Sequence, residues 1–193
     1  MKQETKRIIA VILIIAISIS LGIAVDMGWT FLEKRLYPLS YDDLISNASA
    51  EFGVPKYIIY AVIKVESDFD PDAVSSADAR GLMQMIEPTF KWLTSDEHLD
   101  ENLPYRRVFE PEVSIRYGTY YLSYLYKKFD YNWDTAFAAY NGGEGNVAKW
   151  LADPKYSDGE GNLTDIPFTE TEKYVKKVND AIETYKKLYP ENT

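Results

Sequence analysis

An uninterrupted apolar segment near the amino terminus constrains this chain more than any other feature. From Ile8 to Val25 there is no ionisable residue, and Ile, Val, Leu and Ala predominate. An α-helix of this length spans about 27 Å, close to the roughly 30 Å hydrocarbon core of a bilayer. The sequence therefore predicts a single transmembrane helix over residues 8–25.

The residues that flank this segment indicate its orientation. Residues 1–7 carry three basic side chains and one acidic one, while the aromatic Trp29 and Phe31 follow the segment. Basic flanks stay on the cytoplasmic side of a membrane, and aromatic residues favour its interfaces. We therefore expect residues 1–7 in the cytoplasm and the rest of the chain on the extracytoplasmic side of the cell membrane.

A cleaved signal peptide is the alternative interpretation of the same segment. Gly22-Ile23-Ala24 contains the small residues that a cleavage site requires, and the remaining chain would then be secreted. The apolar run is long for the core of a signal peptide, which favours the uncleaved anchor. Mass spectrometry distinguishes the two, because a mature protein that starts at Val25 would exclude the anchor.

Composition excludes several classes of chemistry. The chain has no cysteine and one histidine, His98, so thiolate nucleophiles, disulfides and histidine-rich metal sites are excluded. We expect neither a metal nor another cofactor. The first 25 residues hold three of the 21 basic residues and one of the 30 acidic ones, which leaves a net charge of −11 on the remainder. No basic face is available there for nucleic acid.

Helical periodicity dominates the sequence after the apolar segment. Residues 26–39 are interpreted as a tether, and residues 40–190 as a mainly α-helical domain that we expect to be monomeric. The expected helices are 40–52, 55–67, a short helix from Pro88, 111–129, 133–140 and a last helix from Thr169. Ser40 is expected to cap the first of these, and a Thr169–Glu172 capping box the last.

Glu66 is the first candidate for a catalytic residue. Ile59, Val62 and Ile63 form an apolar stripe on the second expected helix, and Glu66 continues this stripe. Burial disfavours the charged form of a carboxyl group and raises its pKa, as a general acid requires. Spacing alone nevertheless favours an ordinary glutamate that turns toward solvent at a helix end, so other residues must decide.

Four segments of the chain together resemble the signatures of one enzyme family. They are Glu66-Ser67, Gly81-Leu82-Met83-Gln84-Met85 followed by Pro88-Thr89, Ala139-Tyr140-Asn141-Gly142-Gly143, and Ile166-Pro167-Phe168-Thr169-Glu170-Thr171 followed by Tyr174-Val175. Their order and spacing resemble those of soluble lytic transglycosylases, a family related to goose-type lysozymes. The resemblance covers roughly residues 40–189 and implies a lysozyme-like helical domain.

The resemblance implies roles for individual residues. Glu66 would be the catalytic acid/base. The substrate-binding residues would be Ser67, Gln84, Met85, Tyr140, Asn141 and Glu170. The Ser67 hydroxyl would orient the carboxyl group or a sugar, and the Gln84 amide suits an N-acetyl group because both donate and accept hydrogen bonds. Structural hydrogen bonding alone is the alternative for Gln84 and Tyr140.

The resemblance also implies a reaction on peptidoglycan. Members of the family are understood to use one glutamate, which first protonates the oxygen between N-acetylmuramic acid and N-acetylglucosamine. The same glutamate then removes the proton of the muramoyl C6 hydroxyl, and a 1,6-anhydro ring closes. We therefore expect a membrane-anchored lytic transglycosylase with Glu66 in both roles and a peptidoglycan strand as its partner.

Two other functions fit the same sequence. A lysozyme-type hydrolase would need a positioned water and a base, which the sequence does not identify. A non-catalytic cell-wall-binding protein would keep the cleft without turnover, but the intact Glu66 and its complete surrounding motifs disfavour this alternative. Digestion products distinguish the three: anhydro-muropeptides, hydrolysed muropeptides or none.

Overall fold

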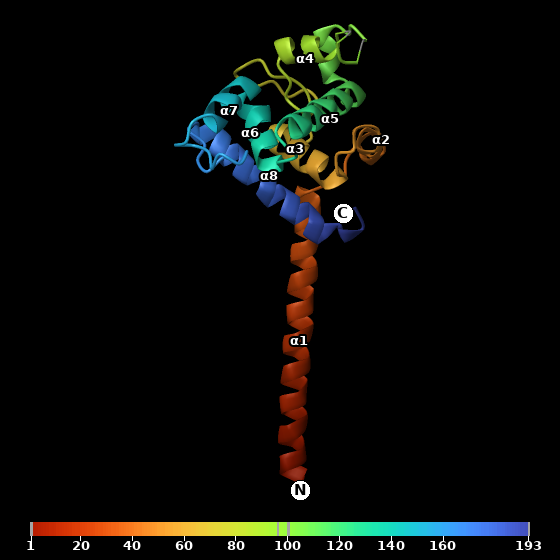
Figure 1. Cartoon of the computed structure of the whole chain (residues 1–193). Helices are drawn as coiled ribbons and strands as arrows, with labels where there is room; N and C mark the ends of the chain where they lie inside the picture. The colour runs from red at the N-terminus through yellow and green to blue at the C-terminus, as the bar shows by residue number, and fades with distance from the viewer. Residues whose placement is uncertain (1, 96, 100, 193) are drawn as a thin grey trace. The chain divides into compact units, whose positions relative to one another are not determined.

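The chain folds into two compact α-helical units. The computed structural model describes residues 2–95, 97–99 and 101–192, and one unit ends at Pro38 while the other begins at Leu39. Across these residues, helices are joined by turns and isolated bridges, without a β-strand (Figure 1). The predicted fold class, a mainly α-helical protein, is confirmed.

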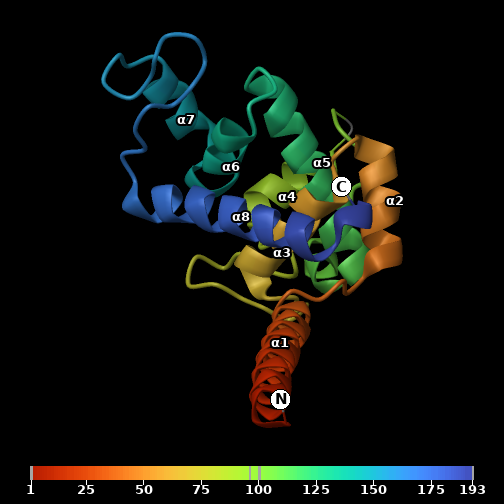
Figure 2. The same ribbon diagram turned by 90° about the horizontal axis from the view of Figure 1, so that it is seen from below.

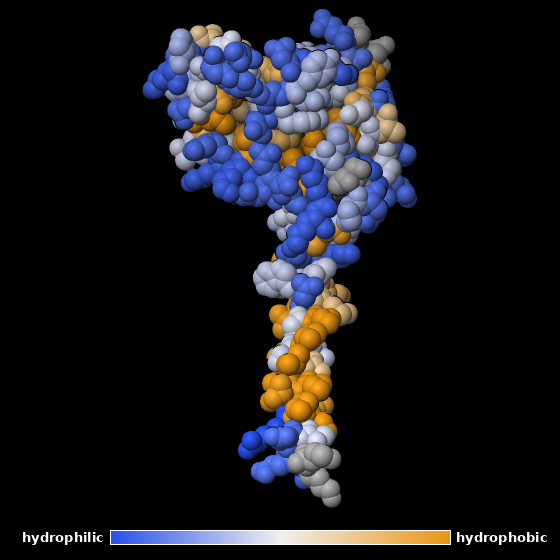
Figure 3. Space-filling model, turned by 60° about the horizontal axis from the view of Figure 1, so that its bottom comes forward, coloured by the Kyte–Doolittle hydropathy of each residue, from blue (hydrophilic) through white to orange (hydrophobic). Residues whose placement is uncertain are grey.

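The first unit is a single long helix, α1 (Lys2–Leu36). It contains a stretch that is long and apolar enough to cross a membrane, with a mean hydropathy of 3.1. The large apolar side chains of this stretch are exposed, as the orange surface in Figure 3 shows. The segment interpreted as a tether continues this helix as far as Leu36. A membrane anchor and a signal peptide both form such a helix, so the choice between them stays a prediction.

The second unit is built around one buried helix, α3. Its principal helices are α2 (Asp42–Phe52), α3 (Lys56–Ser67), α5 (Pro111–Lys128), α6 (Trp133–Gly142) and α8 (Thr169–Leu188). Every side chain from Ile58 to Ile63 on α3 is buried. α8 packs against both α3 and α6, and α5 packs against α2 and α6 (Figure 2). These contacts bring the carboxyl end of α3 close to α6 and the first turns of α8.

Four shorter elements complete the second unit. They are α4 (Glu87–Leu93), the 3-10 helices η1 (Tyr105–Phe109) and η2 (Pro190–Asn192), and α7 (Glu144–Leu151). α4 has Pro88 in its first turn, as predicted. Neither η1 nor α7 was predicted from the sequence, because elements this short contain too few turns for a clear periodicity.

Both side-chain caps expected from the sequence are wrong. Tyr41, in a left-handed conformation, precedes α2 and provides no side-chain cap, so Ser40 does not have that role. α8 begins at Thr169 itself, and Phe168 takes the cap position without a capping side chain. The Phe168 ring packs edge-on against Trp150, at 5.0 Å between centroids, which holds Phe168 in an extended conformation before the helix. The capping box therefore does not form.

Candidate active site

Glu66 lies in the last turn of α3, at the wall of a hollow of about 280 Å³. The hollow is lined by Glu66, Ser75, Ala77, Ala79, Gln84, Met85, Ile86, Thr89, Tyr121, Tyr140, Asn141, Gly143 and Glu170. These residues come from five helices, α3, α4, α5, α6 and α8, from the loop that follows α3, and from the turn after α6. The fold therefore assembles one concave site from segments that are far apart in the sequence.

Most of the predicted site residues meet at this hollow. Six of them line it: Glu66, Gln84, Met85, Tyr140, Asn141 and Glu170. Ser67 is not among the lining residues, and its hydroxyl donates to the Leu82 carbonyl oxygen at 2.8 Å. Ser67 thereby joins the end of α3 to the segment that carries Gln84 and Met85.

The surroundings of Glu66 favour its protonated form. Burial raises the pKa of Glu66 from an ordinary 4.5 to about 7, while the Tyr174 hydroxyl acts in the opposite direction. No ion pair among the described residues involves Glu66. A carboxyl group with a pKa near 7 can both deliver and accept a proton at neutral pH. Glu66 is therefore not an ordinary solvated glutamate at a helix end.

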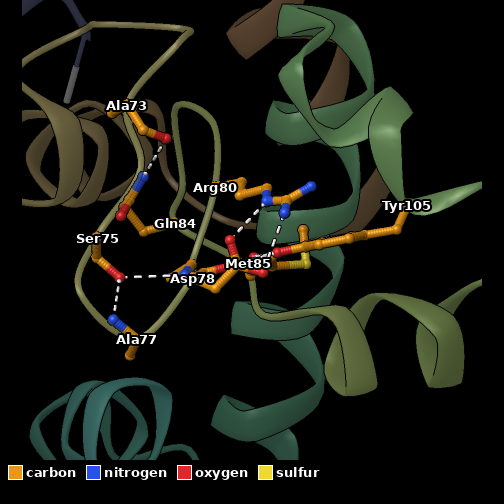
Figure 4. A network of polar contacts seen from close by, with 9 residues as sticks. Ala73, Ser75, Ala77, Asp78, Arg80, Gln84, Met85 and Tyr105 are labelled. Atoms are coloured by element: carbon orange, nitrogen blue, oxygen red, sulfur yellow. Dashed lines mark hydrogen bonds and ion pairs between the residues drawn. The ribbon is translucent and has the colours of Figure 1, made fainter.

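Gln84 uses one half of its amide to hold the protein backbone. Its Nε2 donates to the carbonyl oxygen of Ala73 at 3.0 Å (Figure 4). The same atom donates to the carbonyl oxygen of Gly81 at 2.9 Å. Both contacts require a donor, so they determine the orientation of the amide. The Oε1 atom is left as an acceptor on a residue that lines the hollow. Structural hydrogen bonding, the alternative role for Gln84, therefore accounts for the Nε2 end of the side chain but not for the Oε1 end.

The loop between Ala73 and Arg80 forms one wall of the hollow and is tied down along its length. The Ser75 hydroxyl accepts from the backbone N–H groups of Ala77 and Ala79, at 3.2 and 3.1 Å (Figure 4). The Tyr105 hydroxyl lies 2.7 Å from the Asp78 carbonyl oxygen. These contacts hold the small side chains of the loop at the edge of the site.

The Arg80 side chain stabilises this loop through contacts with Asp78 and Tyr105. Its guanidinium group donates two hydrogen bonds to the Asp78 carboxylate, at 2.9 and 3.0 Å, and lies 4.8 Å from the centre of the Tyr105 ring. Gly81 follows with a φ of 76°, and a Cβ there would lie 2.2 Å from the Val108 carbonyl oxygen. Gly81 therefore forms a tight turn in a conformation that favours glycine, and the space allows no larger residue.

α6 presents Tyr140 and Asn141 to the hollow. The Tyr140 hydroxyl donates to the Met83 carbonyl oxygen at 2.8 Å, so this tyrosine also has a structural hydrogen bond. The Thr171 hydroxyl, from the first turn of α8, donates to Asn141 Oδ1 at 2.8 Å. The Nδ2 group of Asn141 is therefore left to donate into the hollow.

Several residues of the site were not predicted as such. Thr171 and Tyr174 stand within or beside the last family motif, but no role was assigned to them. Tyr121 lines the hollow from α5, and no role was assigned to it from the sequence. The described residues contain no group of three or more His, Cys, Asp or Glu side chains that could hold a metal ion.

Comparison with known families decides the family to which this chain belongs. A model of the Transglycosylase SLT domain matches residues 43–162. The chain belongs to this family. The resemblance inferred from the four motifs is therefore confirmed for the SLT domain, within which Glu66, Gln84 and Tyr140 all lie.

Named relatives of this SLT domain fall into two groups. The soluble lytic murein transglycosylase of Salmonella typhimurium is 34% identical over 151 residues, which are 78% of this chain and 23% of that protein. The membrane-bound lytic murein transglycosylase C of Photorhabdus laumondii is 32% identical over 184 residues, covering 85% of this chain and 51% of the relative. The chain thus spans a quarter to a half of the length of these relatives.

Solved structures share the fold of the SLT domain. The 70 kDa soluble lytic transglycosylase of Escherichia coli aligns with a TM-score of 0.73 and 31% identity, over 80% of this chain and 25% of that one. The lytic transglycosylase Slt of Pseudomonas aeruginosa, solved as an inactive glutamate-to-glutamine mutant, aligns with a TM-score of 0.70 and 28% identity, over 89% of this chain and 30% of that one.

Proposed function

We propose that this protein is a peptidoglycan lytic transglycosylase in which Glu66 is both the acid and the base. The observation that carries the proposal is a half-buried glutamate, whose pKa desolvation raises to about 7, at the wall of a hollow in an SLT domain. Relatives of both groups are named lytic murein transglycosylases. The inactive Pseudomonas aeruginosa mutant, in which glutamine replaces a glutamate, supports a role for a single carboxyl group in the family.

The reaction needs two proton transfers at one carboxyl group. Glu66 first gives its proton to the oxygen between N-acetylmuramic acid and N-acetylglucosamine, and the bond from this oxygen to muramoyl C1 breaks. The neighbouring acetamido group stabilises the positive charge on C1. The Glu66 carboxylate then takes the proton of the C6 hydroxyl, whose oxygen bonds to C1 to form the 1,6-anhydro ring. Glu66 ends protonated, and no water is consumed.

The amide groups at the hollow complement an N-acetyl group. Asn141 offers an N–H donor because Thr171 occupies its oxygen, and Gln84 offers an oxygen acceptor because its nitrogen is hydrogen-bonded to backbone carbonyls. An N-acetyl group presents one carbonyl acceptor and one N–H donor. We propose that these two side chains bind an N-acetyl group of the glycan strand, with Met85 and Tyr140 contributing apolar surface.

A hydrolase is the second candidate, and one observation favours it. Glu170 lines the same hollow as Glu66, so the site contains a second carboxyl group. In inverting glycosidases the second carboxylate activates a water that attacks the sugar. Glu170→Gln would abolish such a hydrolysis, whereas in the transglycosylase it would affect substrate binding alone.

Digestion of peptidoglycan tests these proposals. The full chain in detergent micelles, and its Glu66→Gln variant, are incubated with purified sacculi, and the products are identified by liquid chromatography and mass spectrometry. Anhydro-muropeptides from the unaltered chain alone support the proposal. Reducing-end muramic acid, heavier by one water, identifies a hydrolase, and intact glycan identifies a binding protein. Glu172→Gln is the matched control, because Glu172 is exposed on α8 and does not line the hollow.

We further propose that α1 anchors the protein in the membrane with the SLT domain outside the cytoplasm. Because the chain has no cysteine, single cysteines report topology without interference. Gln3→Cys and Thr164→Cys place an exposed thiol on either side of the apolar stretch. A membrane-impermeant maleimide should label intact cells at position 164 and not at position 3. Release of the protein into the medium would instead identify a cleaved signal peptide.

A further inference from the structure

The buried hydroxyl of Tyr174 lies against the Glu66 carboxyl group, close enough to lower its pKa by hydrogen bonding, although the contact is not of standard hydrogen-bond geometry. Its side chain on α8 is 6% exposed, and the hydroxyl oxygen makes no hydrogen bond of standard geometry to any described residue. Among these residues only Thr119 and Thr135 share this property. A buried hydroxyl without a hydrogen bond of standard geometry lowers stability, and phenylalanine would fill the same space without that cost. The hydroxyl of Tyr174 therefore needs an explanation other than packing.

The groups that surround this hydroxyl are those of the active site. α8 packs against α3 and α6, and the titratable groups that act on Tyr174 from these helices are Glu66 and Tyr140. Tyr121 on α5 acts in turn on Tyr140, and Glu170 lines the hollow one turn before Tyr174. The Tyr140 hydroxyl already donates to the Met83 carbonyl oxygen. The Tyr174 hydroxyl is therefore the one available to the Glu66 carboxyl group.

We propose that Tyr174 is a positioning residue, whose hydroxyl donates a hydrogen bond to the Glu66 carboxylate between the two proton transfers. The proposal rests on the function proposed above. Glu66 loses its proton to the glycosidic oxygen and regains one from the C6 hydroxyl, while Tyr174 keeps its own proton throughout. A hydrogen bond from a neutral hydroxyl to a carboxylate is short and strong, and it stabilises the charged form.

Glu66 must be protonated for the first proton transfer and ionised for the second, and the contact with Tyr174 stabilises the ionised form. Burial keeps Glu66 protonated before the first transfer, but the same burial destabilises the carboxylate that must remove the second proton. A donor that binds the carboxylate limits this penalty. Burial and the neighbouring Glu66 raise the pKa of Tyr174 well above its ordinary value, so its hydroxyl stays protonated and able to donate.

Tyr174→Phe tests the proposal in the full chain in detergent micelles. The Glu66 pKa is measured without substrate by carboxyl ¹³C NMR, with the resonance assigned by its loss in Glu66→Gln. We expect this pKa to rise by about one unit, since one unit corresponds to a tenfold change in the ionisation equilibrium. The basic limb of the pH–rate profile should move upward with it, kcat should fall about tenfold (about 1.4 kcal/mol), and KM should change little. The melting temperature should not fall.

A control and a second variant complete the test. Thr119→Val removes another buried unpaired hydroxyl and should leave the Glu66 pKa and the pH profile unaltered. If Tyr174→Phe fails to fold, 3-fluorotyrosine at position 174 replaces it, and this stronger donor should lower the Glu66 pKa.

Two outcomes separate this proposal from the proposed function. An unaltered Glu66 pKa in Tyr174→Phe, or in the fluorotyrosine protein, overturns the role of Tyr174 whatever the activity. A pKa that shifts as expected in a protein that yields no anhydro product overturns the proposed function and leaves the contact between Tyr174 and Glu66 intact.

Discussion

Replacing Glu66 by glutamine should stabilise the folded domain increasingly as the pH rises. The pKa of Glu66 is about 7 in the folded protein against an ordinary 4.5, because burial disfavours its charge. Between these values the folded state binds more protons than the unfolded state, so the stability of the unaltered protein falls as the pH increases. Each unit of pKa difference corresponds to about 1.4 kcal/mol, which gives a loss of about 3 kcal/mol once the pH exceeds 7.

Urea unfolding across pH 4 to 8 measures this effect. Residues 39–193 form a compact unit with their own buried core, so this part of the chain can be studied alone. Its three tryptophans, Trp92, Trp133 and Trp150, report unfolding by fluorescence. All other titrating groups are shared, so the difference in unfolding free energy between Glu66→Gln and the unaltered domain isolates Glu66. This difference should grow by about 3 kcal/mol between pH 4.5 and pH 8.

The same experiment can refute the reasoning. A difference that does not change with pH would mean that Glu66 ionises in the folded domain as it does in water, which would contradict a general acid whose pKa is raised by desolvation. Glu172→Gln, an exposed substitution on α8, provides the control for removal of a carboxylate without burial. Equal denaturant slopes for all three proteins are required for the comparison.

Three further substitutions have definite expected outcomes. Gly81→Ala should lower the unfolding free energy by about 2–4 kcal/mol in urea, because its φ is positive and the new Cβ would meet the Val108 carbonyl oxygen. Thr171→Val should raise KM for glycan strands more than it lowers kcat, since Asn141 loses the hydrogen bond that orients its amide; steady-state kinetics decides, and an unchanged KM would contradict it. Arg80→Ala should cost less than about 1 kcal/mol by thermal unfolding, because its ion pair is solvent-exposed, and a larger loss would show that the loop wall depends on it.

The helices could be predicted wherever a long periodic segment ends at a proline or glycine. The helix α5 begins at Pro111 as expected, and Gly53 ends α2 in a left-handed conformation with its N–H donating to the Ser49 carbonyl oxygen. The expected caps at Ser40 and Thr169 were wrong because helix starts also depend on contacts with distant residues. Phe168 illustrates this, since Trp150 holds it in the cap position.

The candidate site could be predicted in part. The order of the motifs identified Glu66, Gln84 and Tyr140, which do meet at one hollow. Their hydrogen bonds could not be predicted, because each partner is a backbone or hydroxyl group brought close by the fold. Ser67 shows the difference: its neighbour in sequence suggested a role beside the carboxyl group, but its hydroxyl binds the Leu82 carbonyl oxygen.

The amino-acid sequence by itself determined the apolar helix, the mainly helical domain and the position of Glu66 on the buried stripe of α3. These are properties of short segments, in which the spacing of apolar residues decides the structure. Only the tertiary structure decided that Glu66 has a pKa near 7, that Tyr174 lies beside it, and which end of each amide is left for a ligand. Desolvation and hydrogen bonding depend on groups that approach in space, and Tyr174 is more than a hundred residues from Glu66 along the chain.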